Sequence, residues 1–415
     1  MRTVGTSSRG HDKAWVKTGK IFRLTLGAAL VVLVAALVAG CGEETTATTT
    51  GGGSQPSGDP IVIGAIVSAT EANAALGTQE RNVLEMMEGY INGAGGVLGR
   101  PVKIIIEDDK SDPQEAVTAA NRLIDQEKVV ALIAATGSSS TVAVKAITAE
   151  RQIPQMAMVA ANVITDEPPI DWIWRTPQKN AVAAARLLEY VSETLGVTKI
   201  GVLHNENAFG SDGMVAITEM AADYGLEIVA AESFKTDDSD LTAQLTSIRS
   251  ADPEALIVWD TSQGAALAAV NMQQLGMDIP YIGSHGIANT TFIKLAADSA
   301  EGVVFVAGRL VIPSSITDPD QKEVTDTFIE TYEYEWGEPP NPFAGYAFEA
   351  ITILVDAIER AGSTEPEAIQ AALNATEDFA GPDGFYNYSE TDHDGLVAAD
   401  MVMVKIENGE WALVE

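Results

Sequence analysis

Residues 95–124, GGVLGRPVKIIIEDDKSDPQEAVTAANRLI, carry the pattern that decides the fold. Val102 to Ile106 is a short apolar run rich in β-branched residues, which is typical of a buried strand. The signals of a helix start follow at once: Asp112 as N-cap, Pro113 at the first helical position and Glu115 as capping-box partner. A strand that leads directly into a helix is the building unit of an α/β fold with parallel strands.

The same alternation extends to both sides of this unit, in two series. In the first, we expect strands at 61–67, 102–106, 129–134, 155–159 and 172–175, with a helix at 141–150. In the second, we expect strands at 200–203, 227–231, 255–259, 281–283 and 303–306, with helices at 213–224, 241–250 and 264–275. Helices at 321–336 and 343–361 return the chain to the first series. A hairpin of strands 398–406 and 411–414, turning at Asn408-Gly409, closes it.

Two such series predict two doubly wound lobes, each a parallel sheet covered by helices on both faces. We assign residues 60–176 and 307–384 to lobe 1, and residues 177–306 and 385–415 to lobe 2. This division makes the chain pass between the lobes three times, so the lobes are expected to be joined by a three-crossing hinge.

The first forty residues differ from everything that follows. Six basic side chains precede the apolar run from Leu24 to Val38, which is typical of a secretory signal and short for a membrane span. The run ends before Cys41, the only cysteine, and small residues before a lone cysteine resemble a bacterial lipobox. We therefore expect residues 1–40 to be a lipoprotein signal peptide and Cys41 to be lipid-modified. An uncleaved anchor with an incidental buried cysteine is the alternative. Residues 41–59, rich in Thr, Gly and Ser, predict a flexible linker.

Composition excludes several classes of function. The formal charge of −34 disfavours nucleic acid, whose recognition needs a basic surface. One cysteine allows no intramolecular disulfide, and no histidine pair has metal-ligand spacing, so neither a metal site nor a cofactor is expected. Nucleophile-elbow and phosphate-loop motifs are absent from the sequence. An enzyme is therefore not expected, and a hydrolase in particular lacks a nucleophile–base pair.

Ligands of open parallel sheets bind beyond the carboxyl ends of the strands. In lobe 1 these positions hold Ser68 and the run Thr136-Gly137-Ser138-Ser139-Ser140-Thr141, which leads straight into a helix. Hydroxyls and free N–H groups at a helix N-terminus favour a ligand carboxylate. The alternative is that Ser140 or Thr141 only caps the helix. In lobe 2 the corresponding loops hold Thr261 and His285, the latter either a ligand contact or a loop histidine satisfied by the protein itself.

In the order of its segments, nearly all of residues 60–415 resembles the branched-chain amino acid binding proteins of ABC importers, which have a type I periplasmic binding fold. The resembling stretches include residues 95–124, the ATGSSST loop, WRTPQ at the first hinge crossing, HNENAFGSDG, the SHG loop and AEGVVFVAG. The resemblance implies a ligand held between lobes that close by hinge bending.

Carried over by position, the resemblance implies ligand contacts in three regions. The carboxylate-binding serine matches Ser138, between Gly137 and Ser139, and the next contact segment matches Ala160, Ala161 and Asn162. The aromatic cover matches Phe209, and the acid that pairs with a ligand ammonium matches His285. Two residues depart from the family pattern, Ala161 where amino-acid binders carry threonine and His285 where they carry glutamate. A buried ammonium without an acidic partner is costly, which favours a carboxylate without an amine.

The predicted function is therefore an extracytoplasmic binding protein that captures an amino acid or a related small carboxylate. It delivers this ligand to the permease and ATPase subunits of an ABC importer. We expect a monomer, tethered to the membrane by lipid on Cys41. Two alternatives stay open, a sensor that reports its ligand to a receptor and a transporter component for an amine-free aromatic or branched acid.

Overall fold

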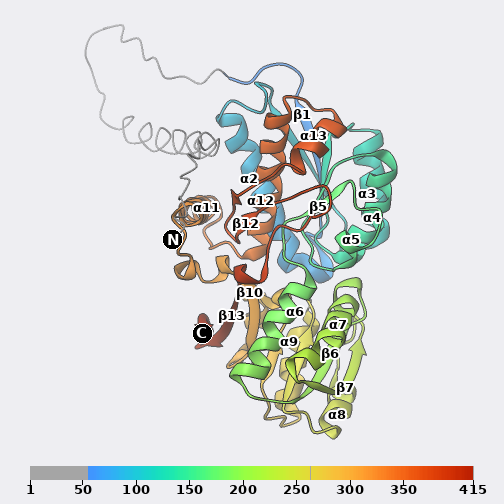
Figure 1. The fold of residues 1–415 in the computed structure, drawn as a ribbon, viewed down its shortest axis with the longest axis vertical. Coiled ribbons are helices and arrows are strands. Elements are labelled where there is room, and N and C mark those ends of the chain that lie inside the picture. The colour runs from blue at the N-terminus through green and yellow to red at the C-terminus, as the bar shows by residue number, and fades with distance from the viewer. Residues whose placement is uncertain (1–54, 262, 415) are drawn as a thin grey trace, which may run out of the picture.

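The computed structural model describes residues 55–261 and 263–414. These residues form two α/β lobes, each with an open sheet, that lie one after the other along the long axis of the molecule (Figure 1). Lipidation of Cys41, the signal peptide and most of the linker lie outside the described residues. The predicted α/β class with parallel sheets is confirmed. Within the described part of the chain, no helix is both long enough and apolar enough to span a bilayer.

The first sheet is entirely parallel, with the strand order β2-β1-β3-β4-β5. Its strands are β1 (Ile61–Val67), β2 (Val102–Asp108), β3 (Ala131–Ala134), β4 (Gln155–Ala157) and β5 (Ile173–Arg175). Side chains alternate between its faces, as the pleat requires. Ile61 and Ile63 pack towards α2 (Ala74–Gly93) and α12 (Pro342–Ala361), whereas Ile66 packs towards α3 (Pro113–Asp125) and α4 (Ser138–Arg151). The small helices α5 (Val163–Asp166) and α13 (Pro366–Leu373) and the long α11 (Pro319–Trp336) complete this lobe.

The second sheet has the order β14-β13-β10-β9-β8-β6-β7. Its parallel strands are β6 (Lys199–Asn205), β7 (Glu227–Phe234), β8 (Ala255–Trp259), β9 (Tyr281–Gly283) and β10 (Val304–Gly308), and the hairpin of β13 (Met401–Glu407) and β14 (Glu410–Val414) adds antiparallel strands at one edge. One face is covered by α6 (Asn180–Glu189) and α7 (Ala208–Met220), the other by α8 (Thr242–Ser250), α9 (Gln263–Gln274) and α10 (Thr290–Ala296). Asn408 and Gly409 both have positive φ, as the predicted tight turn requires.

One apolar cluster connects the lobes. It contains Ile61 and Leu354 from the first lobe together with Val202 and Trp259 from the second. The chain passes between the sheets three times: between β5 and α6, between β10 and α11, and between β12 (Phe385–Tyr386) and β13. We call these the first, second and third crossings. They fix both lobes to one hinge region at the waist seen in Figure 1.

Several local expectations need correction; the hairpin strand expected from Ala398, for example, begins at Met401. The helix expected from Thr141 begins at Ser138, and the one expected from Gly213 begins at Ala208, because the Asn207 side chain accepts from the Gly210 N–H at 2.8 Å. Asp112 caps α3 as predicted, accepting from the Gln114 N–H at 2.7 Å. Glu115 is not needed for a capping box, since the Asp112 N–H already donates to the Asp109 carbonyl at 2.9 Å.

The predicted lobe boundaries at 306/307 and 384/385 also fall too early, the first because β10 of the second sheet continues to Gly308. Residues 388–394 run beside β5: Arg175 donates its N–H to the His393 carbonyl at 3.0 Å, and the Tyr388 hydroxyl donates to the Arg175 carbonyl at 2.7 Å. His393 stacks on Trp174 at 4.9 Å between ring centroids. This segment therefore belongs with the first sheet, and the third crossing comes after it.

Candidate functional site

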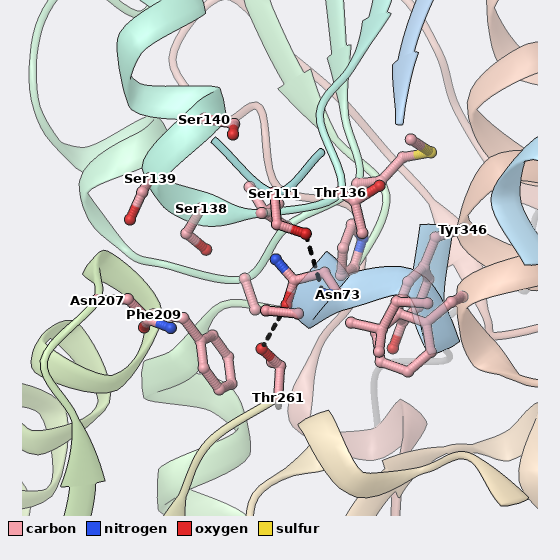
Figure 2. A pocket seen from close by; sticks show the side chains of 18 of the residues that line it. Asn73, Ser111, Thr136, Ser138, Ser139, Ser140, Asn207, Phe209, Thr261 and Tyr346 are labelled. Carbon is pink, nitrogen blue, oxygen red and sulfur yellow. Dashed lines mark hydrogen bonds between the residues drawn. The ribbon is translucent and has the colours of Figure 1, made fainter. Parts of the chain in front are cut away.

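A cavity of about 230 Å³ lies where the carboxyl ends of strands from both sheets face each other (Figure 2). The loops that follow β1 to β9 and the start of α12 all contribute to its wall. Its lining residues are Ala72, Asn73, Leu76, Ser111, Pro113, Thr136, Gly137, Ser138, Ser139, Ser140, Met158, Val159, Ala160, Pro177, Asn207, Phe209, Thr236, Thr261, His285, Phe343 and Tyr346. Seven of the ten residues predicted for the site are among them: Gly137, Ser138, Ser139, Ala160, Phe209, Thr261 and His285.

The lobe 1 wall is built around the N-terminus of α4. Gly137 is the N-cap residue, and no side chain caps this helix end. The first-turn N–H groups, which lack intrahelical partners, therefore remain available at the cavity. Thr141 acts on the loop instead, since its Oγ1 accepts from the Ala135 N–H at 2.9 Å. Neither Ser140 nor Thr141 caps the helix, so the capping alternative is wrong.

The three serines of this turn differ in their partners. Ser139 Oγ accepts from the Ala208 N–H of lobe 2 at 3.1 Å, which connects the two walls. Ser138 and Ser140 are both buried, and neither hydroxyl is bonded to another described residue. Figure 2 shows all three side chains on the first turn of α4, above Asn73 and Phe209. Ser138 and Ser140 thus retain hydrogen-bonding capacity that a ligand can use.

The lobe 2 wall contributes an aromatic corner. His285 lies edge-on to Phe209, with 5.1 Å between ring centroids, and edge-on to Trp259 at 6.0 Å. Only 4% of its surface is exposed, and burial lowers its pKa to about 3. The ring is therefore neutral at physiological pH and carries one N–H. Its Nδ1 has no hydrogen-bond partner among the described residues, so His285 is not a loop histidine satisfied by the protein.

The cavity lining has a distinctive electrostatic character. Among the described lining residues there is no aspartate, glutamate, lysine or arginine. The titratable side chains are His285, which is neutral, and Tyr346, whose pKa burial raises well above its ordinary value. A ligand carboxylate would meet backbone N–H groups and hydroxyls, whereas a ligand ammonium would meet no opposite charge.

Ser68 lies behind the cavity instead of in its wall. Its N–H donates to Thr136 Oγ1 at 2.8 Å and its hydroxyl donates to Asp109 Oδ1 at 2.6 Å. Thr136 in turn donates to Glu80, whose pKa burial raises to about 8. This buried chain of hydrogen bonds holds the loops after β1, β2 and β3 together. Ser68 is therefore a support for the wall.

Ala161 and Asn162 also lie outside the cavity. Ala161 is fully buried in a small apolar cluster with Val159 and Ile164. The Asn162 N–H donates to Asp212 Oδ2 of lobe 2 at 2.8 Å, and its side-chain oxygen accepts from the Ala181 N–H at 3.0 Å. Since these polar groups are already occupied at the first crossing, Asn162 joins the lobes and Ala160 alone of the three reaches the cavity.

The prediction missed lining residues from several places, including Ser111 and Pro113 after β2 and Thr236 after β7, and two further places show why. Asn73 donates its N–H to Ser111 Oγ at 3.0 Å and accepts from Thr261 Oγ1 at 3.4 Å across the cleft, as the dashed lines in Figure 2 show. It follows the carboxyl end of β1, where the rule on parallel sheets already pointed, but the predicted site stopped at Ser68. Phe343 and Tyr346 come from the start of α12, which nothing in the local sequence connects with the loops of the first sheet.

Comparisons with known proteins agree with this architecture. The family model described as "Periplasmic binding protein" matches residues 60–410. A Leu/Ile/Val-binding protein homolog of Brucella melitensis is 26% identical over 80% of this chain and 88% of the relative. An extracellular ligand-binding receptor from Rhodopseudomonas palustris superposes with a TM-score of 0.80 at 28% identity, covering 86% of this chain and 100% of the other. A solute-binding protein of R. palustris in complex with benzoate shares the fold, with a TM-score of 0.75, 20% identity and 86% and 96% coverage of the two chains.

Proposed function

The chain belongs to the periplasmic binding protein family of the branched-chain amino acid type, and on this premise we propose that it is the solute-binding lipoprotein of an ABC importer. It captures a small carboxylate between its lobes and delivers it to a membrane permease, with no reaction of its own. The family implies an extracytoplasmic location. Tethering through lipid on Cys41 and action as a monomer are parts of the proposal.

The observation that carries the proposal is the cavity between the lobes. The open N-terminus of α4 and the unpaired Ser138 hydroxyl offer donors to a carboxylate without a formal positive charge. Phe209 and Phe343 offer apolar surface to the remainder of the ligand. Ser139, bonded to lobe 2 across the cleft, couples occupation of this wall to closure of the lobes.

The same lining supports an acid without an α-amine as ligand. An ammonium buried in this cavity would lack a counter-charge, which is costly, and His285 stands where an acid would be needed. Leucine and 4-methylpentanoate form a matched pair of probes, because they differ only in that ammonium group. Benzoate, present in a structural neighbour, is the aromatic probe.

Thermal unfolding with each probe tests the ligand class, since a ligand that binds only the folded state raises the melting temperature. We expect 4-methylpentanoate or benzoate to stabilise the protein and leucine to have no effect.

Replacing Ser138 by Ala should weaken the affinity for the stabilising acid about ten- to hundredfold, as expected for a lost hydrogen bond to a charged group. Ser192, whose hydroxyl bonds the Tyr224 carbonyl far from the cavity, provides the matched control Ser192→Ala. Equal affinity in the Ser138→Ala and control proteins would refute the assignment of the carboxylate to α4.

A gain-of-function variant tests the role of position 285. His285→Glu introduces the counter-charge that an ammonium needs, so it should create leucine binding and weaken binding of 4-methylpentanoate. Binding of leucine by the unmodified protein would restore the usual amino-acid ligand and reject the amine-free class, while leaving the binding function itself intact.

The lipid anchor is tested separately, because Cys41 lies outside the described residues. The mature protein isolated from membranes should begin at an acylated Cys41, as shown by the mass of its N-terminal peptide. Cys41→Ser should release it from the membrane. An unmodified chain that still begins at Met1 would support the uncleaved anchor instead.

A further inference from the structure

All three crossings meet around two carboxyl groups, Glu349 on α12 and Asp383 just before β12. We call these two residues the hinge acid pair. Both are fully buried, and the Asp383 N–H donates to Glu349 Oε1 at 2.8 Å. The Asp383 carboxyl packs directly against Gly308, at the start of the second crossing. A Cβ added at Gly308 or at Gly345 of α12 would lie 2.3 Å from one of its oxygens.

No basic residue in the described part of the chain forms an ion pair with the hinge acid pair. Arg309, next to Gly308, instead donates to the Ser315 carbonyl at 3.2 Å and the Ala399 carbonyl at 2.7 Å, which connects the second and third crossings. The other titratable side chains whose charges act on the pair or that contact it are Tyr346 on α12, Tyr386 on β12, Tyr388 after it, and Asp400 at the third crossing. None of these supplies a positive charge.

The hydrogen atoms around Tyr386 can be counted. Its hydroxyl oxygen lies 3.0 Å from the Thr176 carbonyl at the first crossing and also contacts Glu349 Oε2. The hydroxyl has a single hydrogen, and a carbonyl oxygen can only accept. If Tyr386 donates to Glu349, the buried Thr176 carbonyl receives no hydrogen from it. If Tyr386 donates to Thr176 instead, the contact with Glu349 is satisfied only when Glu349 carries a hydrogen and donates it, so both contacts are satisfied together only with a protonated Glu349. The arrangement is then a chain from Glu349 through Tyr386 to Thr176.

Asp383 requires a hydrogen for a different reason. Neither of its carboxyl oxygens has a well-aligned donor among the described residues. The Leu310 N–H lowers the pKa of Asp383, but burial raises that pKa by more. An isolated carboxylate in a dry interior is strongly destabilised, so such a group is neutral instead. Burial is the largest cause that raises the pKa of Asp383 and of Glu349 well above their ordinary values, and for Glu349 a charge on Asp383 would raise it further.

We propose that the hinge acid pair is a proton-dependent lock on the three crossings. In the folded protein both carboxyl groups are protonated. The hydrogen on Glu349 connects α12 with the first crossing through Tyr386, and the neutral Asp383 carboxyl can pack against Gly308 at the second crossing. Loss of that hydrogen leaves negative charge with no counter-charge at the waist, which loosens the crossings and lets the lobes separate. The lock concerns the hinge, so it does not depend on the identity of the ligand.

The direction of the pH dependence follows from linkage. A group with a raised pKa in the folded state stabilises fully below its ordinary pKa, and the stabilisation is lost as pH rises through the folded value. Each additional proton held by the folded state therefore raises the unfolding constant about tenfold per pH unit within that window. Glu80, with a pKa raised to about 8, acts in the same direction but lies in α2, away from the crossings.

The test combines small-angle scattering with denaturant unfolding of the purified protein between pH 5 and pH 9, without added ligand. We expect the radius of gyration to increase, and the unfolding constant to rise, as pH increases. Glu349→Gln and Asp383→Asn, separately and together, should reduce both dependences. The side-chain amide that Glu349→Gln introduces would keep a donor for Tyr386 at every pH.

The matched control is Glu80→Gln, the same substitution at a buried acid outside the hinge. It should remove only the part of the pH dependence of the unfolding constant that comes from Glu80. The change of the radius of gyration with pH should stay as in the wild type. A radius that does not change with pH in the wild type, or that changes equally in the wild type and in each hinge variant that folds, would overturn the proposal. So would a hinge effect of Glu80→Gln equal to that of Glu349→Gln.

Discussion

Two buried polar clusters hold the hinge region, and they solve the problem of burial in opposite ways. At the first crossing, Arg175 is fully buried and its Nε lies 2.6 Å from Asp394 Oδ1, while Lys179 contacts Asp394 Oδ2 at 2.7 Å. At the second and third crossings, both members of the hinge acid pair are as fully buried as Arg175, but they have no cation among the described residues. The first cluster keeps its charges and pairs them, whereas the second is stable only without charge.

This difference gives the two clusters opposite responses to pH. Although burial opposes it, pairing with Arg175 and Lys179 lowers the pKa of Asp394, so its stabilising effect is present above the ordinary carboxyl pKa and is lost in acid. Burial raises the pKa of both members of the hinge acid pair, so their effect is lost as pH rises. A hinge built from both clusters is therefore most stable between these limits.

The largest effect should come from breaking the paired cluster. Arg175→Met keeps much of the side-chain volume but removes the main partner of Asp394 and the donor to the Thr165 hydroxyl. We expect a loss of about 3–5 kcal/mol in the free energy of unfolding, as for other buried pairs that lose one partner. Urea unfolding at pH 7 measures it. A loss below about 1 kcal/mol would mean that Lys179 alone compensates Asp394.

An intermediate effect should come from the uncharged cluster. Tyr386→Phe removes the hydroxyl between Glu349 and Thr176 and leaves buried polar atoms unpaired, but no isolated charge. The expected loss is about 1–3 kcal/mol at pH 6, the range for an unsatisfied buried neutral group. The same urea titration applies. A loss as large as that of Arg175→Met would indicate that Glu349 is charged and that the contrast between the clusters is false.

The smallest effect should come from an ion pair outside the hinge. Lys322 contacts Asp326 at 3.0 Å one turn along α11, and both side chains are about half exposed. Solvent screens such pairs, so Lys322→Ala should change the free energy of unfolding by only about 0.3–0.5 kcal/mol. This variant sets the scale for the other two. A loss above about 2 kcal/mol here would remove burial as the explanation of the ranking.

Sequence patterns predicted the strands well, because a short apolar β-branched run such as Ile61–Val67 is typical of a strand covered on both faces. They predicted the start of α3 because Asp112 and Pro113 act locally. The start of α4 was missed by three residues, since Gly137 caps it without a side chain and the first apolar residue of the helix is Val142. Local signals therefore predicted the existence of a helix or strand more reliably than the residue at which it begins.

The candidate site was predictable only in part for the same reason. The rule on the carboxyl ends of strands found Ser138 and His285, because it depends on topology alone. It also selected Ser68, whose hydroxyl is bonded to Asp109 behind the wall, a contact that links two loops far apart in the sequence. Nor can local patterns reveal the hinge acid pair, since Glu349 and Asp383 meet only through the packing of α12 against the segment before β12.

The order of the sheets and helices along the chain has a consequence for folding during translation. The strands of the first sheet are complete at Arg175, but α12, which packs over β3 and β4, follows only after all five parallel strands of the second sheet. While the middle of the chain is being made, part of that apolar face therefore stays uncovered. Contacts between such distant segments form slowly, so the first lobe should reach its native packing late, after the second has begun to fold. A nascent chain arrested before α12 should accordingly remain sensitive to protease and bind chaperones through the uncovered face.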